Sequence, residues 1–193
     1  DGLNDYDLAD IAKKVYSVSG TRKDARKLCL RLISGKSSDN FYIFHFPKLL
    51  NTLAQHQPEV FLDVFLAEGT ATSKQRRGIF LNSGFSWREN PLSRIDDQTV
   101  LKWCAKKPNV RYLRFAKEAL LFHRPSKETP YEWKPLFFEI LDRAPSQKEI
   151  LESTTNNMRP SSWSGSLHLI LEQRAVLFEG LEEHADPAIR KLA

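Results

Sequence analysis

The longest regular pattern of apolar and polar positions runs from Val100 to Phe122, and it predicts two short helices. Pro108 divides them, because proline lacks an amide hydrogen and disfavours helical geometry in the residue before it. Isolated helices shorter than about 12–15 residues are marginal in water, so each must bury its apolar side against a neighbour. The apolar positions recur at steps of three and four, at Val100, Leu101, Trp103 and Cys104 and then at Val110, Leu113, Ala116, Ala119 and Leu120.

The same pattern of helix, proline turn and helix is found at four places along the chain. The turn prolines are Pro58, Pro108, Pro145 and Pro187, which follow one another at steps of 50, 37 and 42 residues. These steps bracket the period of about 40–47 residues that is typical of HEAT and armadillo repeats. The recurrence predicts a series of antiparallel helix pairs that cover one another's apolar sides.

The last of these units resembles the HEAT family of α-solenoids. Its Asp186-Pro187, Ile189 and Arg190 are similar to that family's turn and second-helix start, and Pro108, Val110 and Arg111 match in part. The resemblance covers roughly residues 49–193 and implies a superhelix of stacked helices without implying any chemistry. The segments NPLSRI, LKWC with RY, and SSWSGS with LEEHADP also look similar to C-terminal regions of large uncharacterised bacterial proteins.

We therefore predict an all-α fold of HEAT-like stacked helical hairpins, an α-solenoid with a right-handed superhelix. We expect residues 1–193 to form one elongated domain, part of a longer protein. Residues 67–98 have the composition of a long irregular connection, with a short helix around residues 73–81, and connections of this length are often functional. The run 41–46, FYIFHF, fits either a strand or a buried helix.

Several helix starts are indicated by capping residues. The segment 4–18 has a helical apolar side, and Thr21 with Asp24 resembles a capping box for the next helix. Thr129-Pro130 with Glu132 predicts a further helix start, and Ser146 with Glu149 predicts another.

Cysteine usage and hydropathy favour a cytoplasmic protein. Cys29 and Cys104 stand 75 positions apart on apolar helical sides, so we interpret them as inert core thiols in a reducing compartment. No apolar run approaches the roughly 20 residues that span a bilayer, and the start of the chain lacks a secretory signal pattern. We expect no membrane association.

Charge points to candidate anion contacts. The chain has 29 Lys and Arg against 24 Asp and Glu, a net charge of +5, which favours an anionic partner without requiring one. Residues 102–117 hold six cations and no acid, and Arg111 and Arg114 project together, with Tyr112 and Phe115 between them. A second group has Lys23, Lys27 and Arg31 at four-residue steps, with Arg22 and Arg26 beside them. The candidate nucleic-acid contacts are Lys23, Lys27, Arg76, Arg77, Lys106, Arg111, Arg114 and Lys117.

Both groups also fit ordinary solvated surfaces, and no catalytic motif supports an enzyme. The sequence lacks HExxH, a Walker loop, Gly-x-Gly-x-x-Gly and Cys-x-x-Cys, so we predict neither a catalytic site nor a metal or other cofactor. Asp96 and Asp97 are interpreted as helix caps. Arg174, on an apolar helical side, is expected to pair with a carboxylate or a carbonyl.

The first hypothesis is a non-enzymatic helical-repeat scaffold or sensor region that binds a protein partner within a larger protein or complex. The alternative is an α-solenoid that binds nucleic acid through a basic helical face. An exposed end repeat would also favour self-association. Steep weakening of nucleic-acid binding by salt would separate the two hypotheses.

Overall fold

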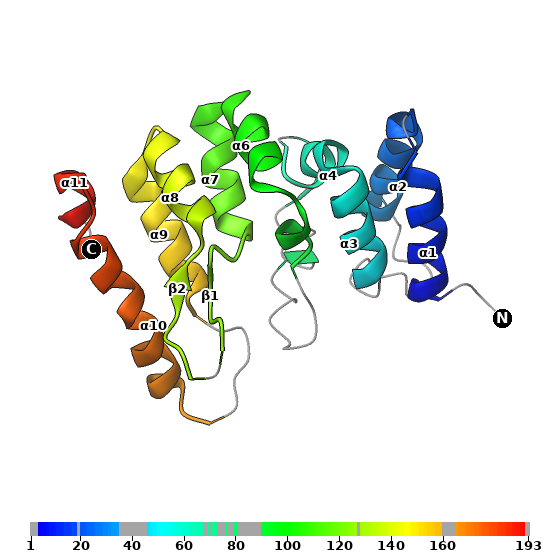
Figure 1. The fold of residues 1–193 in the computed structure, drawn as a ribbon. Helices are drawn as coiled ribbons and strands as arrows, with labels where there is room; N and C mark the ends of the chain where they lie inside the picture. Colours follow the sequence, from blue (N-terminus) through cyan, green and yellow to red (C-terminus); the bar gives the residue numbers. More distant parts are fainter. Residues whose placement is uncertain are drawn as a thin grey trace. The chain divides into compact units, whose positions relative to one another are not determined.

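A computed structural model of the chain describes residues 4–18, 20–34, 46–67, 69, 71–72, 76, 79–80, 90–126, 128–159 and 165–191. In this part the chain is mostly helical, with one small two-stranded sheet (Figure 1). The predicted helical character is confirmed, whereas the sheet was not predicted. None of the helices within the described ranges has the length and apolarity needed to cross a bilayer.

The chain divides into two compact units, Asp1–Trp103 and Cys104–Ala193. The stacking of all hairpins into one elongated domain stays a prediction. The strand-or-helix question at FYIFHF falls mainly on residues 41–45, outside the described residues. Most of the predicted short helix at 73–81 also lies outside them, with only residues 76, 79 and 80 described there, all helical.

The first unit contains two helical hairpins followed by a shorter helical segment. Asn4 starts the first helix with a capping box, because its side chain accepts hydrogen bonds from the amides of Tyr6 and Asp7 while the Asp7 carboxylate accepts from the Asn4 amide. The described elements are α1 (Asp5–Tyr16), α2 (Arg22–Ser34), α3 (Pro47–His56), α4 (Pro58–Phe65), the 3-10 helix η4 (Pro91–Arg94) and α6 (Asp97–Ala105), whose last two residues are assigned to the second unit.

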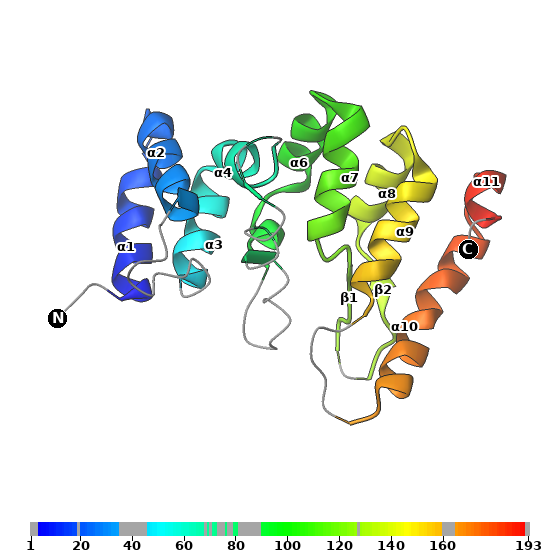
Figure 2. The same cartoon turned by 180° about the vertical axis from the view of Figure 1, so that it is seen from behind.

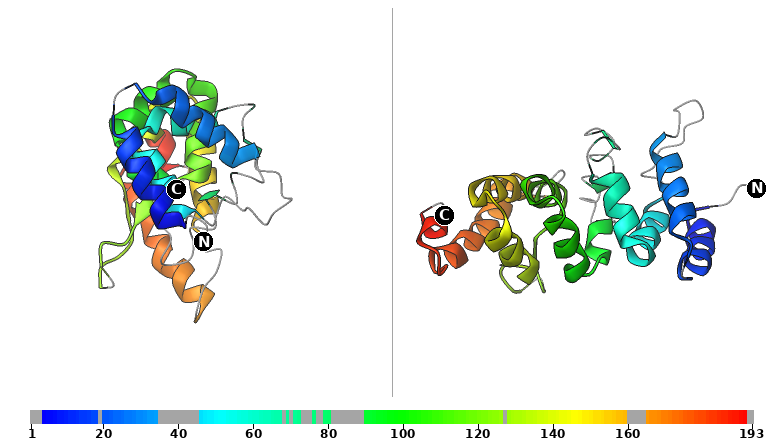
Figure 3. Two further views of the ribbon diagram at one scale, coloured as in Figure 1. Left: turned by 90° about the vertical axis from the view of Figure 1, so that its right-hand side faces the viewer. Right: turned by 90° about the horizontal axis from the view of Figure 1, so that it is seen from above.

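Like elements of the two hairpins lie side by side. The first helix of one hairpin packs on the first helix of the other, α1 on α3, and the second on the second, α2 on α4 (Figures 1 and 2). Figure 3 shows these pairs from above, α1 and α2 in blue beside α3 and α4 in cyan. This packing buries Ala12 of α1 and the leucines of α3, whereas Ile11 and Val15 of α1 stay exposed.

The core of the first unit is centred on α3, α4 and α6. Phe61 and Phe65 are fully buried, with ring centroids 4.5 Å apart. Trp103, predicted to be apolar and buried, is 1% exposed, and its indole Nε1 donates to the Asp63 carboxylate at 2.8 Å. Asp96 accepts from the Thr99 amide at 2.9 Å, which confirms its predicted role as a cap at the start of α6.

The second unit continues with hairpins and a two-stranded sheet. Pro108 and Pro187 occupy the first turn of their helices, as Pro58 does in the first unit, and Pro145 precedes the N-cap residue Ser146. The described elements are α7 (Pro108–Glu118), β1 (Phe122–His123), β2 (Glu132–Trp133), α8 (Pro135–Arg143), α9 (Gln147–Asn157), α10 (Leu167–Glu182) and α11 (Pro187–Arg190).

The predicted helix start at Thr129 is wrong. The helix begins at Pro135, and the Thr129 hydroxyl instead closes a turn by donating to the Ser126 carbonyl and accepting from the Ser126 amide. The next residues pair antiparallel with β1, placing Trp133 opposite Phe122. The Trp133 ring stacks 3.9 Å from that of Phe137 and its Nε1 donates to the Leu177 carbonyl of α10 at 2.7 Å. This burial of a large aromatic residue outweighs the local capping signal.

Within the second unit, α7 packs on α9 and α8 packs on α9. Asn157, at the end of α9, donates through Nδ2 to the carbonyls of Ala116 and Ala119 at 2.9 and 3.2 Å. These carbonyls belong to the C-terminal end of α7, where backbone acceptors have no partner within the helix. The two helices therefore run parallel and end at the same level.

Candidate functional site

The second helix of the chain presents a row of exposed cations. α2 buries Ala25, Cys29 and Leu32, and its contact with α4 lies within the first unit. The helical period places the opposite side in solvent. The exposed cations on that side are Lys23, Arg26, Lys27 and Arg31, which we name the α2 cationic face.

Most of the α2 cationic face is not neutralised by nearby acids. Lys27 lies 3.3 Å from Asp24, and both side chains are largely exposed. The other three cations, Lys23, Arg26 and Arg31, form no ion pair with any of the residues that the structure describes. The sequence pattern identified this side of the helix, with Lys23, Lys27 and Arg31 at four-residue steps and Arg26 beside them, although only Lys23 and Lys27 were named as nucleic-acid contacts.

Arg22, at the start of α2, has a different role from its neighbours. Its guanidinium lies 3.0 Å from the Glu59 carboxylate and 3.9 Å from that of Asp63, both on α4. It therefore joins the two second helices of the hairpins. Such partly exposed pairs contribute about 0–1 kcal/mol each.

The arginines of α7 are less exposed to solvent than predicted. The helix buries Tyr112, Phe115 and Ala116, so the two aromatic residues expected on the basic side lie in the core instead. Arg111 and Arg114 are consequently half-buried, and each already interacts with other residues of the chain.

The remaining predicted contact residues differ in their exposure and in whether they already interact with other residues of the chain. Lys117 is exposed, whereas Lys106 is exposed but already takes part in an interaction with the chain. Arg76 is 7% exposed, and its Nη1 donates to the Ala71 carbonyl, so its charge serves the interior of the first unit. Arg77 lies outside the described residues. Of the predicted candidates, the structure brings Lys23 and Lys27 together on one exposed face.

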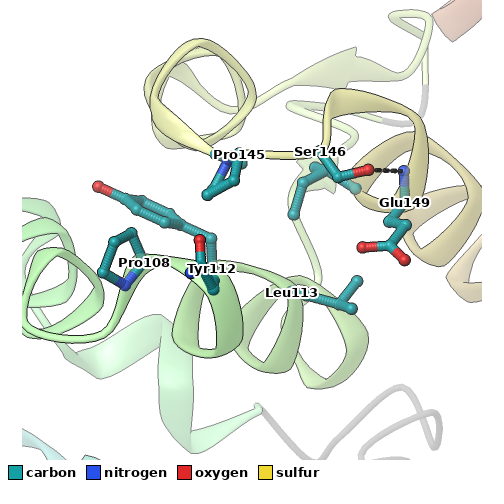
Figure 4. A pocket seen from close by; sticks show the side chains of 9 residues that line it. Pro108, Tyr112, Leu113, Pro145, Ser146 and Glu149 are labelled. Carbon is teal, nitrogen blue, oxygen red and sulfur yellow. Dashed lines mark hydrogen bonds between the residues drawn. The ribbon is translucent and has the colours of Figure 1, made fainter.

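A small pocket lies between the N-terminal ends of α7 and α9. Its volume is about 80 Å³, well below the roughly 300–1,000 Å³ of typical small-molecule sites. Figure 4 shows the Tyr112 ring beside Pro108 and Pro145, two of the predicted turn prolines. The lining residues are Pro108, Asn109, Tyr112, Leu113, Ala144, Pro145, Ser146, Glu149 and Ile150.

Local capping fixes the shape of this pocket. The Ser146 hydroxyl accepts from the Glu149 amide at 3.4 Å, as its predicted capping role requires. Burial raises the pKa of the Tyr112 phenol, so this side chain stays neutral at physiological pH. The pocket is therefore a short recess with both apolar and polar lining residues, among them the exposed Glu149.

Arg174 and Arg124 pack with aromatic rings next to the β1–β2 sheet. Arg174 donates to the Met158 carbonyl, which confirms the predicted pairing with a carbonyl. Its guanidinium also lies over the rings of Phe122 and Tyr131, 5.4 and 5.3 Å from their centroids. The Arg124 guanidinium also lies near the Tyr131 ring, 5.6 Å from its centroid, and its Nε donates to the Thr129 carbonyl at 2.7 Å. These groups hold the β1–β2 connection against α10.

The two thiols and His184 are placed as structural groups. Cys29 and Cys104 are completely buried, and burial raises the pKa of each thiol to about 12. His184 lies 3.6 Å from Asp142 and stacks on Phe138, joining the turn after α10 to α8. Within the described ranges, no group of three or more His, Cys, Asp or Glu is arranged to hold a metal ion.

The described residues thus include an exposed cationic face on α2 and a small recess between α7 and α9. Comparison with known proteins adds no family to this description: no protein-family model, curated protein or solved structure gives a significant match to the chain.

Proposed function

We propose that this chain is a helical-repeat interaction region that binds a protein partner, as the scaffold or sensor part of a larger protein or complex. The observation that carries the proposal is the packing order in the first unit, with first helices on first helices and second helices on second. In HEAT-like repeats, each helix pair covers the apolar side of the next in the same way. Such stacks leave their other faces available for partners.

Hydrogen bonds at both ends keep the two hairpins of the first unit in register. The Asp5 carboxylate of α1 accepts from the amides of Lys48 and Leu49, both at 3.0 Å, at the start of α3. The N-cap residue of α3, Phe46, has no side-chain group for this role. At the other end, Gln57 donates to the Tyr16 carbonyl at 2.9 Å.

The second unit supports the same arrangement. α7 and α9 are the second helices of consecutive hairpins, and they run parallel with Asn157 binding the last carbonyls of α7. Their turn prolines, Pro108 and Pro145, line one pocket. Equivalent turns thus lie beside each other, as repeat stacking requires.

The pocket between these turns is the contact point that we assign to the protein partner. Its 80 Å³ holds the end of one side chain rather than a cofactor. Interfaces commonly place such an anchor in a recess and surround it with weaker contacts. The apolar edges of Pro108 and Tyr112 suit an aliphatic or small aromatic tip.

The experiment compares partner capture by the wild-type chain with capture by two variants. Asn109 is exposed and lines the pocket, so Asn109→Tyr fills the recess without removing a core side chain. Asn156→Tyr makes the same change at an exposed position of α9 away from the pocket. Proteins captured by wild type and by Asn156→Tyr, but not by Asn109→Tyr, are then purified and titrated calorimetrically against all three chains.

We expect a saturable complex that Asn109→Tyr weakens at least about tenfold, or roughly 1.4 kcal/mol, while Asn156→Tyr leaves it unchanged. Thermal unfolding checks that both variants stay folded. Capture of the same proteins by all three chains, with equal affinity, would contradict the assignment of the pocket. Absence of any saturable protein complex would contradict the proposed function itself.

A further inference from the structure

The α2 cationic face has the dimensions of a phosphate-binding surface. Lys23 and Arg31 are eight residues apart on one helix, which at 1.5 Å per residue corresponds to about 12 Å. One strand of duplex DNA carries a phosphate about every 3.4 Å along the axis, so the face spans the rise of three to four phosphates. Arg26 and Lys27 lie between these ends.

Most of the positive charge on this face is not balanced by a carboxylate of the described residues. α2 contains five cations against one carboxylate. Arg22 is directed to Glu59 of α4 and Lys27 to Asp24, whereas Lys23, Arg26 and Arg31 have no acidic partner among the described residues. Four long cationic side chains on one exposed side repel one another, and an approaching polyanion relieves that repulsion.

The chemistry of the face favours a nucleic-acid backbone over an acidic protein. Protein interfaces depend on desolvated aromatic or apolar anchors, but α2 contains no aromatic residue, and its one exposed large apolar side chain is Leu30, at 38% exposure. Phosphate contacts need only exposed cations and carry no base code. Without an aromatic stacking platform, the face suits a duplex better than a single strand.

We infer that the α2 cationic face binds the sugar–phosphate backbone of duplex nucleic acid without sequence preference. This inference does not depend on the proposed protein partner, because it uses a different helix in a different unit. Four phosphate contacts to duplex DNA give a slope of log K against log salt of about −3.6. We expect a dissociation constant near physiological salt of about 10⁻⁴ to 10⁻⁶ M.

The test uses fluorescence anisotropy of labelled 20-base-pair DNA and RNA duplexes with the full chain over a range of salt concentrations. The variant carries Lys23→Gln, Arg26→Gln and Arg31→Gln, which remove charge but preserve helix propensity. We expect its salt slope to fall by about 2.7, and its affinity at low salt to fall at least about 30-fold. Since the three cations form no ion pair with an acidic residue of the described chain, and their mutual repulsion is relieved, the variant should unfold at or slightly above the wild-type temperature.

A control variant removes the same charge elsewhere. Lys107→Gln, Lys117→Gln and Lys191→Gln neutralise three exposed cations of the second unit. We expect this control to keep at least half of the wild-type affinity and a slope within about 0.5 of the wild-type slope. An equal loss in both triple variants would overturn the inference, because net charge alone would then explain binding.

Two further outcomes would also overturn the inference. No duplex binding at 20 mM salt would exclude a phosphate-backbone site. Binding of a poly-glutamate peptide, with the same sensitivity to the three α2 substitutions and with no duplex binding, would assign the face to an acidic protein. Asn109→Tyr should leave duplex binding unchanged, so failure of the pocket and failure of the cationic face are distinguished.

Discussion

α2 and α7 are both basic helices, but they place their charges differently. On α2 the buried residues are Ala25, Cys29 and Leu32, and the cations on the opposite side are all exposed. On α7 the buried residues include Tyr112 and Phe115, and both arginines are half-buried. A helix that packs through small side chains leaves a wide polar side, whereas bulky aromatic residues bring more of the circumference into the core.

The number of cations on a helix does not determine how many of them can contact an external anion. Residues 102–117 form the more concentrated cationic run in the sequence, yet Arg111 and Arg114 are already engaged within the chain. The cations of α2 are interrupted by Asp24, and three of them have no acidic partner among the described residues. Packing therefore decides which basic helix is available to an anion.

The largest expected effect concerns the cores on which the two helices rest. Phe115→Ala should destabilise the second unit by about 3–5 kcal/mol, because it leaves a large cavity where the side chain is 1% exposed. Leu32→Ala on α2, where the side chain is 7% exposed, should cost less, at about 2–3 kcal/mol. Urea unfolding measures both. A larger loss from Leu32→Ala would show that α2 is the more firmly packed helix, against the comparison.

A smaller effect is expected where α1 supplies the cap of α3. Asp5→Ala removes the acceptor for the amides of Lys48 and Leu49 and should cost about 1–2 kcal/mol. Asp10→Ala is the matched control on the same helix, since Asp10 pairs with Lys14 at the surface and its loss should leave stability close to that of wild type. Equal losses in urea unfolding would mean that the hairpins do not depend on this bond.

In the second unit, the hydrogen bonds that link neighbouring hairpins are donated by the side-chain amide of Asn157. Asn157→Ala leaves the Ala116 and Ala119 carbonyls without their donor and should cost about 1 kcal/mol. Asn156→Ala, one residue earlier and exposed, should be close to neutral. Hydrogen exchange at the C-terminal end of α7 gives a local measure. Unchanged protection in Asn157→Ala would contradict the proposed link between α7 and α9.

The helices and their turns could largely be predicted because their signals are local. Pro108 between two apolar stripes placed α6 and α7, and Ser146 with Glu149 placed the start of α9. The β1–β2 pair could not be found in this way. Its stability depends on Trp133 stacking on Phe137 and donating to Leu177, 44 residues away, and no local pattern contains that contact.

The candidate site was predicted in part for the same reason. The spacing of Lys23 and Lys27 identified the exposed side of α2, because a helix with one apolar side has a predictable opposite side. On α7 the sequence pattern predicted an apolar side with Val110 and Leu113 and placed Tyr112 and Phe115 on the basic side. The structure buries the aromatic side, and the choice between them depends on the partner helix α9.

The arginines of α7 give a reciprocal test of the comparison. Arg111→Gln with Arg114→Gln should lower stability by about 0.5–1 kcal/mol, because half-buried guanidinium groups and their stems lose contacts. The same variant should bind a DNA duplex as wild type does, whereas the three α2 substitutions should weaken binding without lowering stability. A double variant that lost duplex binding while keeping full stability would move the anion site to α7.

The smallest expected effect concerns the two thiols, whose ionisation should not change the free energy of unfolding below about pH 9. Burial raises the pKa of Cys29 in α2 and of Cys104 before α7 to about 12, while a thiol in the unfolded chain has a pKa of about 9. Below pH 9 both states keep their protons and stability does not change. Between pH 9 and 12 only the unfolded state ionises, so stability should fall as pH rises.

The same thiols report which packing opens first, that of α2 around Cys29 or that of Cys104 at the end of α6 beside Tyr112 of α7. At pH 8 a disulfide reagent should react with each folded-state thiol only through local opening, and single-cysteine variants Cys104→Ala and Cys29→Ala separate the two rates. We expect Cys29 to react faster, since α2 is held by Ala25, Cys29 and Leu32, whereas the thiol of Cys104 lies beside a helix anchored by Tyr112 and Phe115. Faster reaction of Cys104 would reverse the order of packing strength on which the availability of the α2 charges rests.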